Sequence, residues 1–459
     1  MSKQTIAWVS AFVSVVAFGG LIASGASGGA VASLAILALL MFGAIGWTMR
    51  TARDAAWLPT WVMIGFLAKL AGTFARHYMV AVLYGGGDSF RYFRVGTELA
   101  SEWRAGDIPE LTGGGAFGTQ VVEAITGGMF AIFTPDLLGA FLMFSILAFF
   151  GQLMLYAAFR RWAASHQLKP YAILVFLLPT YSFWPSSLGK DALVLFALGG
   201  AVYFAARTLE TFQLRWLVGL AGFLSIVGLI RIHVAGLVVL ALVGAGVIGR
   251  ARFKADPLAA SRRLIVLVGF AGAGALVLNF LPDIFGVDLV GPGSLDAFTA
   301  DVVRRTSEKG TVAAGGAVTG LADVPGAIAL VLFRPYIIEA SEIQHYFAAL
   351  ETTLVLGLTI WRLPTILRNW RMWRSNAYVV FSTIYFIGFA IAFSVVRNLG
   401  IIARQRGQVL ALFLVVLVIL GWKEKKTARR PMAPTSPPVG ADLKQVSQVQ
   451  QQEHRPQSQ

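Results

Sequence analysis

Apolar runs long enough to cross a lipid bilayer recur from one end of the chain to the other. Most are roughly 17–22 residues long, the length that a membrane helix needs, and short polar or basic stretches separate them. This pattern predicts an all-α, polytopic integral membrane protein with about twelve transmembrane helices. The predicted crossings lie near residues 6–24, 30–48, 57–81, 130–158, 171–186, 188–206, 214–230, 234–249, 264–281, 345–361, 377–396 and 407–421.

The composition supports a membrane protein and removes several other classes. Of the 459 residues, 57% are hydrophobic and 13% charged, and the mean hydropathy of +0.70 excludes an ordinary soluble globule. The net charge of +15 comes mainly from short loops between apolar runs, so the positive-inside rule accounts for it and nucleic acid is not a predicted partner. The sequence contains no cysteine, which excludes disulfides, thiolate metal sites and cysteine nucleophiles.

The basic loops predict the orientation of the chain. An even number of predicted crossings separates each strongly basic loop from the next, so all of them lie on one side, which the positive-inside rule makes the cytoplasm. Both termini are then cytoplasmic, and two long loops, about 82–129 and 282–344, face outward. The basic segments are residues 50–53, 160–169, 250–263, 362–374 and the chain after Lys423.

The ends of the predicted membrane domain, residues 1–422, carry two further signals. The first span is either a signal peptide or an uncleaved signal-anchor, because a lysine precedes it and small residues follow. The tail 423–459 is basic, then rich in Pro and Gln, and is predicted to be disordered.

The apolar run 324–333 is too short to cross and is predicted to be a re-entrant or half-spanning element.

The first outward loop begins with the segment GGGDSFRYF, in which Asp88 precedes a helical pattern. Tyr92, Gly96, Leu99 and Trp103 share one face of that helix, which could lie flat on the outer leaflet. Asp88 either caps the helix or acts as a general base that accepts the proton of an acceptor hydroxyl.

Two cations lie at the predicted outer ends of other spans. Lys190 and Asp191 stand in the first turn after the break WPSSLG, where the helix dipole favours the aspartate but not the lysine. Lys190 is therefore either a snorkelling side chain or the partner of a carboxylate or phosphate. Arg231 lies in a tight outer turn between two apolar spans, where positive charge opposes the inside bias and favours a local anion.

The second outward loop ends in a cluster of charged side chains. Arg334, Glu339, Glu342 and His345 fall within one short stretch beside the half-span. The two glutamates share a helix face, so they could bind a divalent cation or divide acid and base roles, whereas a salt-bridge cluster with Arg334 is the structural alternative. His233, in the predicted turn with Arg231, has no second histidine at ligand spacing, so the sequence predicts no zinc site.

The segment VVRNLGIIARQRGQ places three arginines, Arg397, Arg404 and Arg406, in a predicted outward hairpin before the last span. The planar guanidinium group pairs bidentately with phosphate, which favours arginine for pyrophosphate recognition. Three arginines on the side where arginine is disfavoured therefore predict an anion site, with pairing to external carboxylates as the alternative.

These features together resemble polytopic bacterial enzymes of surface-polysaccharide assembly. The resemblance is carried by the aspartate in the first outward loop, the WPSSLGKD break and the RNLGIIARQR segment. It includes integral-membrane glycosyltransferases with a C-type fold, and the polymerases and ligases that use undecaprenyl-linked sugars. The resemblance implies the bacterial inner membrane, a polyprenyl-linked sugar donor and a glycan acceptor. The resemblance to the glycosyltransferases implies an acidic residue in the external loop after the first span, whereas Asp88 follows the third. The resemblance to the polymerases implies external arginines, as at Arg397, Arg404 and Arg406. The resemblance therefore does not choose between the two kinds of enzyme.

The function predicted from the sequence is transfer or polymerisation of polyprenyl-(pyro)phosphate-linked sugars at the outer leaflet. Asp88 would be the base, with Glu339 orienting the acceptor or holding a divalent cation. The predicted phosphate-binding residues are Lys190, Arg231, Arg334, Arg397, Arg404 and Arg406. The alternative is a transporter or flippase for an anionic or lipid-linked substrate. A transporter needs polar groups near the middle of the membrane, and the centres of the predicted spans are almost purely apolar, which favours the enzyme.

Overall fold

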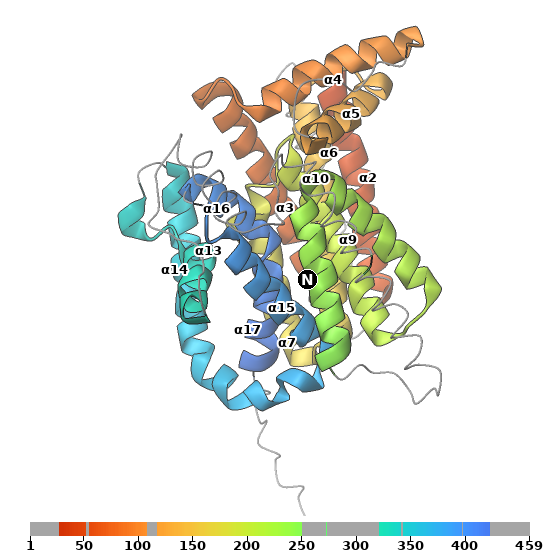
Figure 1. Cartoon of the computed structure of the whole chain (residues 1–459). Helices are drawn as coiled ribbons and strands as arrows, with labels where there is room; N and C mark the ends of the chain where they lie inside the picture. Colours follow the sequence, from red (N-terminus) through yellow and green to blue (C-terminus); the bar gives the residue numbers. More distant parts are fainter. Residues whose placement is uncertain are drawn as a thin grey trace, which may run out of the picture. The chain divides into compact units, whose positions relative to one another are not determined.

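The structure is a computed structural model that describes residues 27–51, 55–107, 117–249, 272, 321–340, 343–396 and 398–422. These residues form helices joined by turns and short extended segments (Figure 1), which confirms the all-α prediction for this part of the chain. The predicted spans 6–24 and 264–281 and the tail 423–459 lie outside the described residues, as do Glu342, Arg397 and most of the loop 282–344.

Most α-helices of the described part follow the apolar runs, and prolines, glycines and capping side chains lie at several of their ends. They are α2 (Gly28–Thr51), α3 (Leu58–Tyr78, continued by a π-helix Met79–Leu83), α4 (Asp88–Ala105), α5 (Phe117–Ile132), α6 (Leu137–Trp162), α7 (Ser165–Leu177), α8 (Pro179–Ser182), α9 (Lys190–Glu210), α10 (Leu214–Ile248), α13 (Val324–Phe333), α14 (Ile343–Asn369), α15 (Ala377–Phe393), α16 (Leu399–Gln405) and α17 (Leu410–Gly421).

Within the described residues, six helices are long and apolar enough to cross a membrane, or seven if the bent pair Leu399–Gln408 and Leu410–Gly421 is one span. The structure therefore indicates a helical membrane protein but does not confirm about twelve crossings. The predicted crossing 171–186 is divided between α7 and the short α8. The predicted crossing 130–158 corresponds to the apolar helix α6, which begins later than predicted. Residues 130–132 belong to the end of α5 instead, because Pro135 separates the two helices and the Asp136 carboxylate caps α6.

Helix α10 contains the turn that the sequence predicts between two spans. Arg231 has non-helical backbone angles (φ −149°, ψ 85°) inside this 35-residue helix. A Cβ atom added at Gly228 would lie 3.8 Å from the Cβ atom of Ala235, whereas seven residues of straight helix separate two positions by about 10 Å. The chain therefore folds back at Arg231, and the two halves form the two arms of α10 in Figure 1.

The first outward loop is mostly helical. Helix α4 buries Tyr92, Gly96 and Leu99, which confirms the predicted amphipathic face. That face packs against α5, most of which lies within the segment predicted to be a loop. The short apolar helix α13 is present as well, and it ends before Arg334 and Pro335.

Helices α6 and α9 cross closely in the core. Gly151 on α6 faces Gly199 on α9, and a Cβ atom added at Gly199 would lie 2.4 Å from the Gly151 carbonyl oxygen. Small residues at such a crossing allow the two backbones to approach closely. Since α9 carries Lys190 and Asp191 at its first turn, this crossing positions part of the site described below.

We predict that Gly199→Val destabilises the protein by at least about 1–3 kcal/mol, the usual cost of overpacking a core. The obstacle is backbone, so no side-chain rotation relieves it. The thermal unfolding midpoint in detergent measures the effect. Gly222→Val is the matched control, because a Cβ atom at Gly222 in α10 meets nothing within 4 Å. Equal midpoints for the two variants would contradict the close crossing.

Candidate functional site

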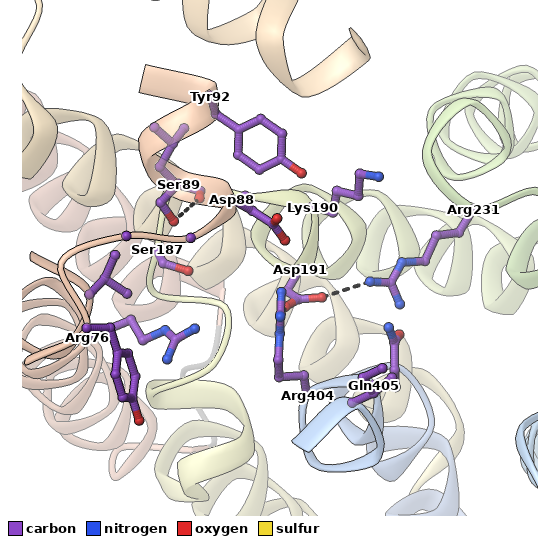
Figure 2. Close-up of a pocket in the computed structure, with 17 residues that line it drawn as sticks. Arg76, Asp88, Ser89, Tyr92, Ser187, Lys190, Asp191, Arg231, Arg404 and Gln405 are labelled. Atoms are coloured by element: carbon purple, nitrogen blue, oxygen red, sulfur yellow. Dashed lines mark hydrogen bonds and ion pairs between the residues drawn. The ribbon is translucent and has the colours of Figure 1, made fainter. Parts of the chain in front are cut away.

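One cavity of about 420 Å³ brings together six charged residues from helix ends and turns (Figure 2). It lies where the end of α3, the start of α4, the start of α9, the turn in α10 and helix α16 meet. Its charged and polar lining residues are Arg76, Tyr84, Asp88, Ser89, Tyr92, Ser187, Lys190, Asp191, Arg231, Arg404 and Gln405. Four of the predicted site residues thus meet in one place: Asp88, Lys190, Arg231 and Arg404.

Asp191 is the buried centre of this cavity. One of its carboxylate oxygens accepts a hydrogen bond from Arg231 Nη2 at 2.9 Å, and the other accepts one from Arg404 Nε at 3.0 Å. The carboxylate therefore connects α9 with α10 and α16. Its side chain is 9% exposed, against 11% for Arg231 and 38% for Arg404, so the pair with Arg231 is the better shielded from water.

Arg76, near the end of α3, is the site residue that the sequence analysis missed. Its guanidinium group stacks on the rings of Phe183 and Trp184, with its central carbon 5.5 and 5.2 Å from the ring centroids. Its Nε atom is buried and has no hydrogen-bond partner among the described residues. An arginine at the end of an apolar run was the available signal, because a charge at membrane depth calls for a partner.

Asp88 stands in the first turn of α4, after a Gly87 whose φ of 117° only glycine adopts readily. Its carboxylate makes no ion pair with the described residues and does not cap the helix. The neighbouring Ser89 hydroxyl donates to the Leu188 carbonyl oxygen at 2.7 Å. This bond ties the start of α4 to the segment before α9 and so holds Asp88 beside Lys190 (Figure 2).

Tyr92 completes the side of the cavity formed by α4. Burial, and then the Asp88 carboxylate, raise the pKa of the Tyr92 phenol to about 12. A phenol is neutral at physiological pH even at its ordinary pKa of about 10, and its hydroxyl can act as a hydrogen-bond donor to an anion or a sugar.

Three predicted site residues do not line the cavity. Arg334 and Glu339 bond to each other, and Glu339 also accepts from the Tyr336 backbone N–H at 2.9 Å. Burial opposes ionisation of Glu339, but the bonds from Arg334 and Tyr336 lower its pKa overall. Arg406 is 1% exposed and donates to the carbonyl oxygens of Val331 and Arg334. Arg334 and Glu339 therefore form the salt bridge that the sequence analysis gave as the structural alternative.

A second polar cluster lies inside the helix bundle, around the break that precedes α9. Lys69, in the middle of α3 and 2% exposed, donates to the carbonyl oxygens of Tyr181 at 2.7 Å and Pro185 at 3.3 Å. Glu351 on α14 accepts from the Thr180 backbone N–H at 2.9 Å. The expectation that the span centres are almost purely apolar is therefore wrong for α3 and α14.

The described ranges contain no group of three or more His, Asp or Glu side chains placed to hold a metal ion. The divalent cation considered for Glu339 stays a prediction. Comparisons with models of protein families, with characterised protein sequences and with solved structures found no match to this chain.

We predict that Asp191→Asn lowers the thermal unfolding midpoint, because it removes the charged ion-pair partner of two guanidinium groups. Breaking a buried ion pair from one side costs about 3–5 kcal/mol, and the 38% exposure of Arg404 moves the expected loss toward the lower end. Asp107→Asn, an exposed substitution of the same kind, is the control. Equal midpoints for the two variants would contradict the central role of Asp191.

Proposed function

We propose that this protein transfers or polymerises sugars carried on a polyprenyl phosphate or pyrophosphate at the outer leaflet of the bacterial inner membrane. One observation carries the proposal: Asp88, a carboxylate that makes no ion pair with the described residues, shares a cavity with four cationic side chains. A carboxylate can accept the proton of an acceptor hydroxyl, and cations can stabilise a phosphate leaving group.

The proposed reaction needs both the Asp88 carboxylate and the cationic side chains of the cavity. The acceptor hydroxyl gives its proton to Asp88 as its oxygen bonds to the anomeric carbon of the donor sugar. The bond between that carbon and the phosphate oxygen breaks, and the electron pair leaves with the polyprenyl (pyro)phosphate. The leaving group gains one negative charge in this step, which Arg76, Arg404 and Lys190 would stabilise.

The surroundings of the cavity favour a lipid-linked substrate. The cavity includes Val80 and Tyr84 at the end of α3 and its π-helical continuation. Beside them, the large side chains of Tyr78, Val82 and Leu83 are exposed, as expected of a surface that faces lipid. A polyprenyl chain could therefore remain in the membrane along α3 while its phosphate group enters the cavity. The positive-inside rule places this end of the helices outside the cytoplasm.

The proposed site contains Asp88, Arg76, Lys190, Arg231 and Arg404, with Asp191 as the residue that positions the last two arginines. It does not include Arg334, Glu339 or Arg406, which bond to each other or to backbone oxygens away from this cavity. Arg397 lies outside the described residues, so its predicted role is not part of the proposal.

We predict that Asp88→Asn lowers the rate of sugar transfer by about 10²–10⁴-fold, the usual contribution of a positioned general base. The assay follows transfer from a panel of polyprenyl-linked sugars to added glycan in proteoliposomes. Lipid binding should survive, since the substitution removes no cation. Glu98→Gln is the control, because Glu98 is exposed on the same helix. A full transfer rate in the Asp88→Asn variant would rule out the proposed base.

A transporter or flippase for a lipid-linked anion is the second candidate, and the polar cluster inside the bundle favours it. Broken helices whose free carbonyl oxygens meet a buried charge are typical of transporter binding sites. Here the break at residues 179–189 meets Lys69 from one side and Glu351 from another.

We predict, for this second function, that vesicles containing the protein expose an inner-leaflet fluorescent polyprenyl pyrophosphate to an external quencher. Lys69→Met should slow that exposure, because it removes the cation that binds the carbonyl oxygens of the break. Exposure at the rate of protein-free vesicles, together with sugar transfer by the same preparation, would exclude the transporter.

A further inference from the structure

Two helices begin at the cavity, each after a glycine that has no capping side chain. Helix α4 follows Gly87 and helix α9 follows Gly189. Their first turns carry the carboxylates of Asp88 and Asp191, respectively. Both glycines line the cavity. The start of a helix carries free N–H groups and a partial positive charge, which together attract phosphate groups. The cavity thus offers two separate positions for anionic oxygens.

Only some of the cationic side chains that line the cavity form ion pairs. Arg231 and Arg404 share Asp191, whereas Arg76 and Lys190 make no ion pair with the described residues. Arg76 in particular has a buried Nε atom without a hydrogen-bond partner in this part of the chain. Its guanidinium group stacks on the rings of Phe183 and Trp184, so it is oriented for a ligand before one arrives.

The formal charge of the cavity indicates how much negative charge its ligand carries. Four cationic and two anionic side chains line it, which leaves a charge of +2. A sugar joined to a polyprenyl chain through one phosphate carries one negative charge, and a sugar joined through a pyrophosphate carries two. Uncompensated charge in a partly buried site costs free energy, so the pyrophosphate-linked ligand matches the cavity better.

We infer that the site takes pyrophosphate-linked rather than monophosphate-linked lipid sugars, with one phosphate group at each helix start and Arg76 bound to the pyrophosphate. This inference rests on the proposed function and narrows its substrate class. Arg76 lies beside the segment that precedes α9, and Lys190 is in the first turn of α9. Arg76 and Lys190 can thus neutralise the two phosphate charges, while Asp191 holds Arg231 and Arg404 in place through ion pairs.

The test compares two probes that differ by one phosphate group: farnesyl-diphospho-glucose and farnesyl-phospho-glucose. Their affinities for the full-length protein in nanodiscs are measured by titration calorimetry, and farnesyl glucoside corrects for partitioning into the lipid. We expect the diphospho probe to bind at least about tenfold more tightly, because charge-assisted hydrogen bonds to a second phosphate are strong. Equal affinities, or tighter binding of the monophospho probe, would overturn the inference.

The variants test the part assigned to Arg76. Arg76→Gln should reduce the preference for the diphospho probe to nearly none, and Arg76→Lys should retain part of it, because lysine keeps the charge but loses the planar fork. Arg94→Gln, an exposed arginine on α4 outside the cavity, is the control and should keep the full preference. A preference unchanged by Arg76→Gln would overturn the assignment, and the wild-type ratio decides the substrate class even if that variant does not fold.

Failure of this inference is distinguishable from failure of the proposed function. If the diphospho probe is preferred but Asp88→Asn transfers sugar at the full rate, the substrate class stands and the proposed base is wrong. If Asp88→Asn loses transfer but the two probes bind equally, the proposed reaction stands and the pyrophosphate assignment is wrong.

Discussion

The arrangement of the cavity depends on one carboxylate that holds two guanidinium groups from separate helices. Arg231 reaches Asp191 from the turn in α10, and Arg404 reaches it from α16. Without Asp191 these two cations would face each other, and a third from Arg76, in a partly buried site. Such repulsion is costly where water is scarce. The ion pairs therefore explain why three segments far apart in sequence can end at the same place.

The position of Asp191 depends in turn on the break that precedes α9. Non-helical backbone at membrane depth needs partners for its free polar groups, and here Lys69 binds two of the carbonyl oxygens while Glu351 binds the Thr180 N–H. Gly72 lets α3 approach this segment, since a Cβ atom there would lie 1.8 Å from the Ser182 carbonyl oxygen. The polar cluster and the close packing together fix where α9 begins, and so where its first turn meets the cavity.

The sequence predicted the helices well and the site in part, for physical reasons. Apolar runs locate helices because burial in lipid or protein requires them, but they do not distinguish a crossing from the shorter pieces α7 and α8. Asp88, Lys190, Arg231 and Arg404 were found because charge at a helix end is unusual wherever it occurs. Arg76 gave the same signal at the end of an apolar run but was overlooked, and its contacts with Phe183 and Trp184 are invisible to a local pattern because those rings are distant in sequence. Asp191 was noticed only for its place in a first turn, because a local pattern does not reveal two partners from other helices.

Arg404 and Arg406 were predicted to share one site, but the local helix geometry separates their side chains. A turn would have left both arginines on one surface, whereas the chain there forms α16 and a following turn of 3₁₀ helix. Residues two apart on a helix point to nearly opposite sides, so Arg404 enters the cavity while Arg406 binds backbone oxygens in the core.

That division bears on the proposed chemistry, because a leaving phosphate gains charge during transfer. A cavity in which every arginine was free would bind the product more tightly than the substrate and release it slowly. Asp191 offsets part of the positive charge and leaves the rest to Arg76 and Lys190. Stabilisation is useful for catalysis only where it is greater in the transition state than in the bound substrate, and a partly neutralised cluster satisfies that condition better than a fully cationic one.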